Sequence, residues 1–130
     1  MQHKSILVIE DDADLNEFLL RYLTLTGYRV HNAYSVEEAL DALCYDELPD
    51  VVISDVDLWD GDCTPILNLL ETPGYNHIPV ILSSGYEFTF HDEMVMARAQ
   101  YFLPKPLSPR SLSRLVKTLV SNSSSPALQQ

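Results

Sequence analysis

The sequence has few glycines, cysteines and basic residues. It has four glycines in 130 residues and no glycine-rich loop, which argues against a phosphate-binding loop of that type. Its two cysteines, Cys44 and Cys63, lack CxxC spacing, so we expect free thiols rather than a disulfide framework. Eight basic residues against nineteen acidic ones give a net charge of −11, which argues against a nucleic-acid surface.

Long apolar runs are also absent. No segment approaches the length of a membrane span or has the form of a signal peptide, so we expect a cytoplasmic protein without a membrane contact. The length predicts one domain over residues 1–120, followed by a polar, serine-rich stretch over 121–130 that we interpret as a flexible tail or the start of a linker.

Short apolar runs alternate with helical patterns along the chain. This alternation predicts an α/β fold, in which a parallel sheet is covered by helices on both faces. We expect five strands, near residues 5–9, 28–33, 50–54, 78–83 and 101–103. We expect five helices, near 12–26, from 35, from 64, near 89–99 and from 109.

Local signals mark several helix ends. Ser35 and Glu38 form a capping-box pattern, in which each side chain accepts a hydrogen bond from the other residue's backbone amide. Thr64, followed by proline, is the expected N-cap of the third helix. Gly27 is expected to end the first helix, whose apolar side includes Phe18.

Acidic residues crowd the ends of two predicted strands. Glu10 and Asp11 follow the first strand, and Asp55 and Asp57 follow the third. Carboxylates held close together repel one another unless they take up protons or share a cation. Oxygen ligands of this kind suit magnesium, which also binds phosphate oxygens, so the pattern indicates phosphoryl chemistry.

Two further polar residues are expected at the same place. Ser84 follows the fourth strand and Lys105 follows the fifth. Ligands of open parallel sheets gather at the carboxyl ends of the strands, so these residues and the acids are expected to share one pocket.

Four segments carry a resemblance to a known family. From Ser5 to about Val120 the sequence resembles the receiver domain of two-component response regulators. The resemblance implies a doubly wound five-stranded sheet of order 2-1-3-4-5 with five helices. The segments are Ile6-Leu7-Val8-Ile9-Glu10-Asp11-Asp12, Val51-Val52-Ile53-Ser54-Asp55, Pro79-Val80-Ile81-Leu82-Ser83-Ser84-Gly85-Tyr86 and Phe102-Leu103-Pro104-Lys105-Pro106.

The resemblance also implies the roles of the acids. Asp55 would accept a phosphoryl group from the phosphohistidine of a histidine kinase, forming an aspartyl phosphate. Glu10, Asp11 and Asp55 would bind Mg²⁺, for which Mn²⁺ can substitute, and the backbone carbonyl of Asp57 would complete the protein ligands. Such a domain catalyses only its own phosphorylation and dephosphorylation and is otherwise a signalling domain rather than an enzyme.

The remaining motif residues would respond to the phosphoryl group. Lys105 would pair with the acids before phosphorylation and with a phosphoryl oxygen afterwards. The Ser84 hydroxyl would bond the new group, and the ring of Phe102, at the aromatic switch position, would turn inward. The peptide before Pro106 is expected to be cis.

Several residues depart from the usual family pattern. Glu10 replaces the commoner aspartate, Trp59 stands where proline is usual, and Cys63 stands where a glycine often ends the loop. Asp57 adds a carboxylate beside the phosphoryl site, and Phe102 lacks the hydroxyl of tyrosine. The conformation of the loop after Asp55 is therefore left open.

Two other functions compete. The Asp55-Val56-Asp57 segment resembles the DxD motif of haloacid-dehalogenase-like phosphohydrolases, but those enzymes need a further acidic motif after the lysine, and no acid follows Glu93 here. A receiver-like interaction module that works without phosphorylation is the second alternative.

The expected partners follow from the resemblance. A histidine kinase or phosphotransfer protein would dock near the first helix, and an effector domain or protein would read the output. The surface of the fourth helix, fifth strand and fifth helix would support a homodimer, in which acidic and basic residues attract one another. These residues are Asp92, Glu93, Arg110, Arg114 and Lys117.

Overall fold

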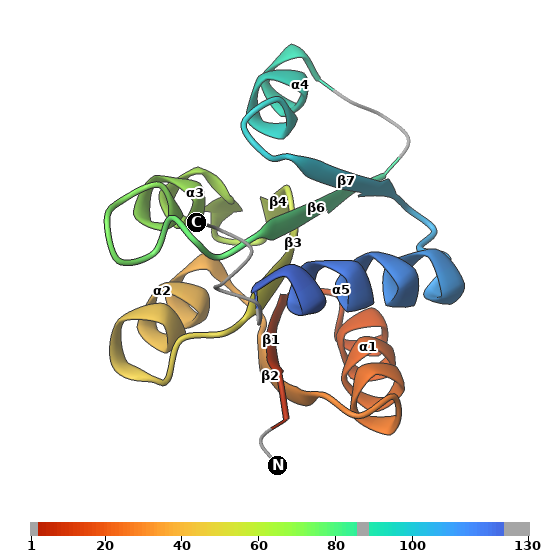
Figure 1. Ribbon diagram of the computed structural model, residues 1–130. Helices are drawn as coiled ribbons and strands as arrows, with labels where there is room; N and C mark the ends of the chain where they lie inside the picture. The colour runs from red at the N-terminus through yellow and green to blue at the C-terminus, as the bar shows by residue number, and fades with distance from the viewer. Residues whose placement is uncertain (1–2, 86–88, 124–130) are drawn as a thin grey trace.

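The computed structural model describes residues 3–85 and 89–123, which form a sheet between two layers of helices (Figure 1). The elements are β1 (Ser5–Ile9), α1 (Ala13–Leu25), β2 (Arg29–Ala33), α2 (Val36–Tyr45), β3 (Val51–Asp55), β4 (Asp57–Leu58), β5 (Gly61–Asp62), α3 (Thr64–Leu70), β6 (Val80–Ser84), α4 (Phe90–Met96), β7 (Tyr101–Pro104) and α5 (Pro109–Ser123). The main sheet has the order β2-β1-β3-β6-β7, and all its pairs are parallel. Numbered among themselves, its five strands have the predicted order 2-1-3-4-5.

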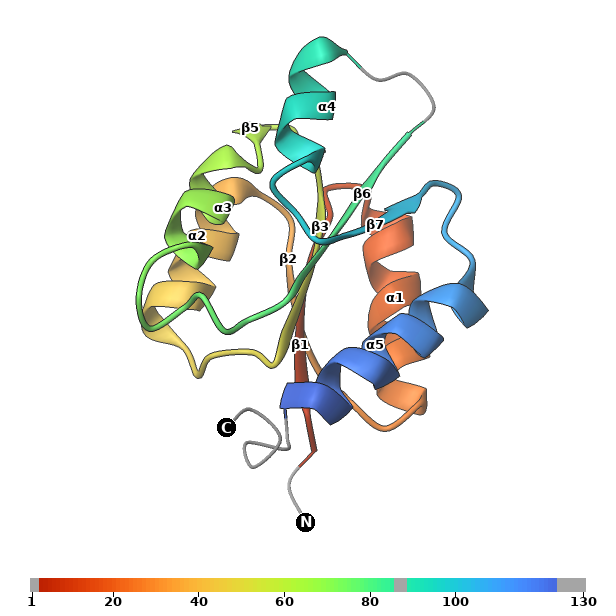
Figure 2. The ribbon, with the colours of Figure 1, turned by 45° about the horizontal axis from the view of Figure 1, so that its top comes forward.

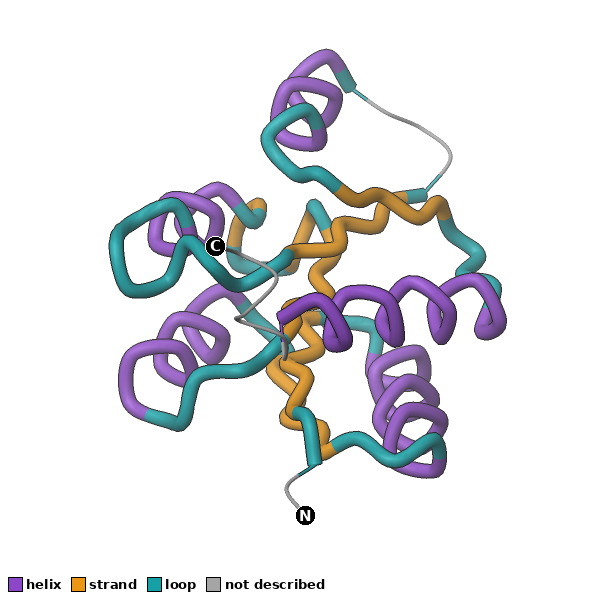
Figure 3. The backbone as a smooth tube through the Cα atoms, in the orientation of Figure 1, coloured by secondary structure: helices purple, strands orange, loops and turns teal. Residues whose placement is uncertain are grey.

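Both faces of the sheet are buried, which explains why the strands are continuous apolar runs. In β1, Ile6 and Val8 pack on the side of α1 and α5, whereas Leu7 and Ile9 pack on the side of α2, α3 and α4. Figure 2 shows α1 and α5 on one side of the sheet and α2 and α3 on the other. The predicted alternation of strands and helices can be followed along the chain in Figure 3.

The first helix begins and ends largely as predicted. Asp12 is the N-cap of α1, and Gly27, with φ of 107°, follows its C-cap. The prediction that Phe18 points inward is wrong, because Phe18 is 46% exposed and stacks on Tyr22 with ring centroids 5.9 Å apart. The polar residue Asn16 is buried instead.

The second helix has only half of the predicted capping box. The Ser35 hydroxyl accepts a hydrogen bond from the backbone amide of Glu38 at 3.0 Å, as predicted. The Glu38 carboxylate accepts from the amide of Tyr34, at 3.2 Å, rather than from that of Ser35. Ser35 therefore still caps α2, while the Glu38 carboxylate binds the amide of Tyr34, the residue before Ser35.

The third helix starts one residue earlier than predicted. Cys63 is its N-cap and makes no side-chain capping bond, so the assignment of Thr64 as N-cap is wrong. The amide of Thr64 instead donates to the carboxylate of Asp62, the last residue of β5, at 2.8 Å.

The loop between β3 and α3 contains a small hairpin that the sequence analysis did not predict. Strands β4 and β5 pair in antiparallel register, with Asp57 opposite Asp62 and Leu58 opposite Gly61. Trp59 and Asp60 form the tip, and Trp59 is 76% exposed. The departure from the family pattern at Trp59 therefore lies in an ordered turn.

The last helix continues past the expected start of the tail. α5 runs to Ser123, and residues 124–130 lie outside the described residues. None of the helices in the described part of the chain is long and apolar enough to cross a membrane.

Candidate functional site

The predicted site residues meet at one edge of the sheet. Glu10 follows β1, Asp55 ends β3, and Ser84 ends β6, so all three lie at carboxyl ends of parallel strands. Lys105 follows β7, and its amide donates to the Ser84 carbonyl at 2.9 Å, which fixes this loop beside β6. The expectation of a shared edge is thus met by the geometry.

Three carboxylates lie close enough to share one cation. Glu10, Asp11 and Asp55 each offer an oxygen, and these oxygens lie within 4.8 Å of one another. Glu10 is 3% exposed, and Asp11 and Asp55 are half-buried. A group of carboxylates in this position is a donor set for a hard divalent ion, so the residues fit Mg²⁺.

Lys105 balances part of this negative charge. Its Nζ lies 2.7 Å from Glu10 Oε1 and 2.9 Å from Asp55 Oδ2. Burial by itself lowers the pKa of Lys105, but the hydrogen bonds to Glu10 and Asp55 outweigh it and raise the pKa. The ammonium group is therefore charged and lies between the two strand ends.

Glu10 is held by α1 as well as by Lys105. Its carboxylate accepts from the amide of Asp12 at 3.1 Å, and its carbonyl accepts from Asn16 Nδ2 at 2.8 Å. Burial raises the pKa of Glu10 above its ordinary value, against the opposing effect of the Lys105 hydrogen bond.

Asn16 was not among the predicted site residues. Its Nδ2 also donates to the Ala33 carbonyl at 3.0 Å, so the amide ties the start of α1 to the ends of β1 and β2. The signal in the sequence was a polar residue beside the apolar stripe of the first helix, which could have indicated a buried side chain that binds backbone groups.

The side chain of Asp57 lies toward α4. Asp57 is exposed, but partial desolvation and the nearby charges of Asp92 and Asp55 raise its pKa. Asp92 itself is only 5% exposed and forms a capping box with Thr89 at the start of α4. The extra carboxylate therefore lies near the acidic start of α4, where the like charges repel each other.

A polar contact joins the same loop to α4. His91 Nε2 and Asp62 Oδ2 form a close ion pair between the first turn of α4 and β5. The hydrogen bond to Asp62 raises the pKa of His91. This contact thus links the hairpin to the helix.

Ser84 and Phe102 lie on one face of the sheet. Leu82 and Phe102 are register partners, and both pack in the core on the side of α2, α3 and α4. Because strand side chains alternate, Ser84 shares this face, whereas Ser83 lies on the other. Within the described residues the Ser83 hydroxyl is buried without a hydrogen-bond partner. The peptide between Lys105 and Pro106 is cis, as the resemblance implied.

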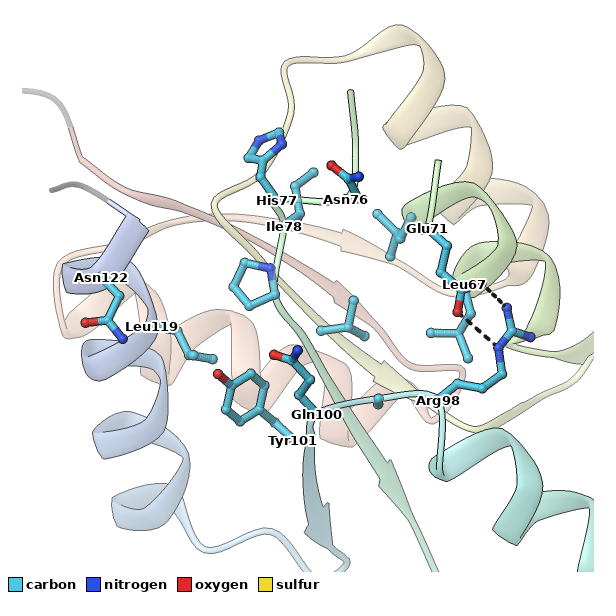
Figure 4. Close-up of a pocket in the computed structure, with 14 residues that line it drawn as sticks. Leu67, Glu71, Asn76, His77, Ile78, Arg98, Gln100, Tyr101, Leu119 and Asn122 are labelled. Atoms are coloured by element: carbon cyan, nitrogen blue, oxygen red, sulfur yellow. Dashed lines mark hydrogen bonds and ion pairs between the residues drawn. The ribbon is translucent and has the colours of Figure 1, made fainter. Parts of the chain in front are cut away.

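A groove of about 430 Å³ lies at the opposite edge of the sheet, where β6 and β7 begin (Figure 4). Its charged residues Arg98 and Glu71 already bind each other, with Arg98 Nη2 2.8 Å from Glu71 Oε1. It lies away from the carboxylates, so it is not part of the candidate site.

Comparison with known proteins identifies a family. The model of the response regulator receiver domain matches residues 6–117. The chain is 30% identical to response regulator MprA of Mycolicibacterium vanbaalenii, over 88% of this chain and 49% of that protein. It is 33% identical to sensor kinase CckA of Brucella abortus, over 89% of this chain and 12% of that protein. The chain thus spans about half, or less, of the length of these relatives.

Solved structures give the same result. The signal receiver domain of a histidine kinase from Syntrophus aciditrophicus is 30% identical, with a TM-score of 0.81 over 92% of this chain and 91% of that one. A CheY-like receiver domain protein from Methanospirillum hungatei shares the fold, with a TM-score of 0.83 over 96% of this chain and 99% of that one at 22% identity. These matches favour the receiver interpretation over the phosphohydrolase alternative. The chain belongs to the response regulator receiver domain family, whose members are signalling domains of two-component systems.

Proposed function

We propose that this domain accepts a phosphoryl group on Asp55 from the phosphohistidine of a histidine kinase or phosphotransfer protein, in a reaction that needs Mg²⁺ or Mn²⁺. The observation that carries the proposal is the convergence of Asp55 with Glu10, Asp11 and Lys105 at the carboxyl edge of the sheet. Four strand ends supply these groups and Ser84, so the arrangement does not depend on one motif.

In the proposed reaction, a carboxylate oxygen of Asp55 attacks the phosphorus in line. The new O–P bond forms as the P–N bond to the donor histidine breaks, and the bonding electrons return to the imidazole nitrogen, which takes up a proton. A divalent ion held by Glu10, Asp11, Asp55 and the Asp57 carbonyl would neutralise charge on the phosphoryl oxygens. Lys105 is already placed against Asp55 and would move to a phosphoryl oxygen.

The response would pass along one face of the sheet. The Ser84 hydroxyl would donate to a phosphoryl oxygen, and Phe102, which lies on the same face, would turn inward as the loop moves. The surface of α4, β7 and α5 would change as a result, in a shift between two populated states. Two observations support this proposal. Few of the described α4 side chains are buried, and the helix contacts the hairpin through His91 and Asp62.

The output surface would support a symmetric dimer. Glu93 is exposed on α4, and Arg110, Arg114 and Lys117 are exposed on α5, so opposite charges are available. Asp92, which we expected to contribute, is buried and forms the capping box with Thr89, so it is excluded from this pattern. Sedimentation equilibrium with a beryllofluoride-loaded domain tests the dimer, and an unchanged monomer would contradict it.

The donor protein would dock on α1 beside the site. Phe18 is exposed there and stacks on Tyr22, which offers an apolar contact next to the acidic edge. We further propose that the receiver domain, predicted over residues 1–120, extends to the end of α5 at Ser123, and that the residues after it form a tail or lead to an effector domain.

The phosphoacceptor assignment is tested with acetyl phosphate and Mg²⁺, followed by intact mass. We expect one phosphoryl adduct that hydroxylamine removes and that Asp55→Asn abolishes. Asp57→Asn is the matched control, because it removes a neighbouring carboxylate but keeps the backbone carbonyl. No adduct at any Mg²⁺ concentration would favour the interaction module that works without phosphorylation.

A further inference from the structure

The β4–β5 hairpin lies between the phosphoacceptor strand and α3, and its base is fixed to the sheet. The amide of Val56 donates to the Ser83 carbonyl at 3.0 Å, which ties the hairpin to β6. The amide of Cys63 donates to the Val56 carbonyl at 2.8 Å, which closes the hairpin at its other end. Asp57 is the first residue of the hairpin and follows Val56 at this base, two residues after Asp55.

The tip of the hairpin is held by a different element. Asp60 Oδ1 accepts from the Val36 amide at 2.9 Å, and Asp60 Oδ2 accepts from the Glu37 amide at 3.1 Å. These amides belong to the first turn of α2, where backbone donors have no partner within the helix. The hydrogen bond from Val36 lowers the pKa of Asp60, which keeps its carboxylate charged.

Helix α2 does not depend on Asp60 for its start. Ser35 is already the N-cap and accepts from the Glu38 amide. The hairpin, in contrast, is a two-residue ladder with the exposed Trp59 beside Asp60. Isolated hairpins of this size are only marginally stable, so the contact contributes more to the hairpin than to the helix.

We propose that Asp60 is a positioning residue of the metal site: by binding the two amides of α2, its carboxylate fixes the hairpin whose first residue, Asp57, presents the carbonyl ligand. This inference rests on the proposed function, since the Asp57 carbonyl is a ligand only if the site binds a divalent ion. Residues that orient ligands from outside the coordination shell change metal affinity by about 10- to 100-fold. Because Asp60 acts on one ligand of several, the lower end of that range applies.

The test is a Mg²⁺ titration of the whole chain. Trp59 is its one tryptophan and lies next to Asp60, so its fluorescence reports the hairpin, and calorimetry gives an independent Kd. We expect Asp60→Ala to weaken Mg²⁺ binding about tenfold. Asp60→Asn, which keeps one acceptor oxygen, should fall between Asp60→Ala and the wild type. Hydrogen exchange at the Val36 and Glu37 amides should become faster in Asp60→Ala.

Two control variants separate positioning from other effects. Ser35→Ala removes the cap of α2 without touching the hairpin, and Glu37→Gln removes a neighbouring charge, so both should leave the Kd within about twofold of the wild type. If Asp60→Ala binds Mg²⁺ as the wild type does, or if either control weakens binding equally, the proposal is overturned. If the wild type binds no Mg²⁺ and forms no phosphoryl adduct, the proposed function fails, and this inference fails with it.

Discussion

Helices α4 and α5 flank the same edge strand, β7, but are held in different ways. α5 packs through an apolar stripe of four buried side chains, which are Leu112, Val116, Leu119 and Val120. Among the α4 side chains that the structure describes, only Val95 and Asp92 are buried. Met96 is half-buried against the core, and polar contacts hold the two ends of α4: His91 in its first turn binds Asp62, and Arg98, just after the helix, binds Glu71.

This difference indicates which part of the proposed output surface can move. Removing an apolar stripe from the core costs several kcal/mol, because each buried side chain contributes about 1.5–3 kcal/mol. Exchanging a few exposed polar contacts costs much less. We therefore expect α5 to be the fixed side of the proposed surface and α4 to be the side that can shift.

The largest expected effect is the loss of an α5 anchor. Leu112 is fully buried, so Leu112→Ala should lower the free energy of unfolding by about 2–5 kcal/mol through lost burial and a cavity. Urea unfolding followed by circular dichroism measures this. Lys117→Ala, at an exposed position of the same helix, is the control and should change stability by less than about 0.5 kcal/mol. A loss below about 1 kcal/mol for Leu112→Ala would contradict the assignment of α5 as the fixed side.

A smaller and more local effect is expected in α4. Val95 is the buried apolar residue among the described side chains of α4, and Val95→Ala removes about two methyl groups, so we expect a loss of about 1–2 kcal/mol. Amide exchange should become faster in α4 while exchange in α5 stays unchanged. Met94→Ala, at a position that is 58% exposed, is the matched control. Equal acceleration in both helices would show that they open as one unit.

The sequence allowed the sheet and the site to be predicted for the same physical reason. Parallel strands buried on both faces are apolar throughout, so each strand end is visible as the point where polar residues begin. Glu10, Asp55, Ser84 and Lys105 all stand at such points, and the structure brings them to one edge. The chemical roles of these residues in metal binding and phosphorylation, and those of Ser84 and Phe102 as switch residues, stay predictions.

What the sequence did not reveal depends on contacts between distant segments. The bonds from Asp60 to the start of α2 and from Asn16 to the end of β1 are side-chain to backbone contacts, which leave no periodic pattern. The hairpin had a local signal in the Asp60-Gly61 dipeptide, which is typical of turns. Phe18 was misplaced because an apolar residue at the margin of the core-facing side of a helix can instead stack on a neighbouring ring at the surface.

The contact between His91 and Asp62 should make the stability of α4 depend on pH. The pKa of His91 is raised in the folded state above its ordinary value of 6.5, so its stabilising contribution is complete below pH 6.5 and is lost as pH rises through the raised pKa. The pair also needs a charged Asp62, whose pKa is lowered, so the contribution is lost again in acid as pH falls through that value.

Replacing this histidine should remove that dependence. Near pH 6, the Tm of His91→Gln should lie below that of the wild type by roughly a few degrees or less, and the difference should shrink toward pH 8. The control is His31→Gln, since His31 and Asp46 lie 3.9 Å apart at the other side of the molecule. A constant difference between wild type and His91→Gln across this range would contradict a role for the charged pair.

The smallest expected effect concerns the other end of α4. The Arg98 guanidinium binds both carboxylate oxygens of Glu71, at 2.8 and 3.1 Å (Figure 4). It also donates to Asn68 Oδ1 at 2.8 Å, so these contacts join the end of α4 to α3. Exposed ion pairs contribute little individually, but a two-point contact is the more favourable geometry. The single variants should therefore unfold within a few degrees of the wild type.

A double-mutant cycle isolates the pair from these small changes. Arg98→Ala and Glu71→Ala should be coupled, and their coupling should exceed that of Arg29→Ala and Glu47→Ala. Arg29 and Glu47 make one contact of 3.1 Å between more exposed side chains, so they are the matched control. If the two couplings are equal, the end of α4 is not held by Arg98, and the contrast with α5 rests on Val95, Asp92 and the His91 pair. If the Arg98 coupling is larger, α4 is held by polar contacts at both ends and can shift by exchanging them, while the core under α5 stays intact.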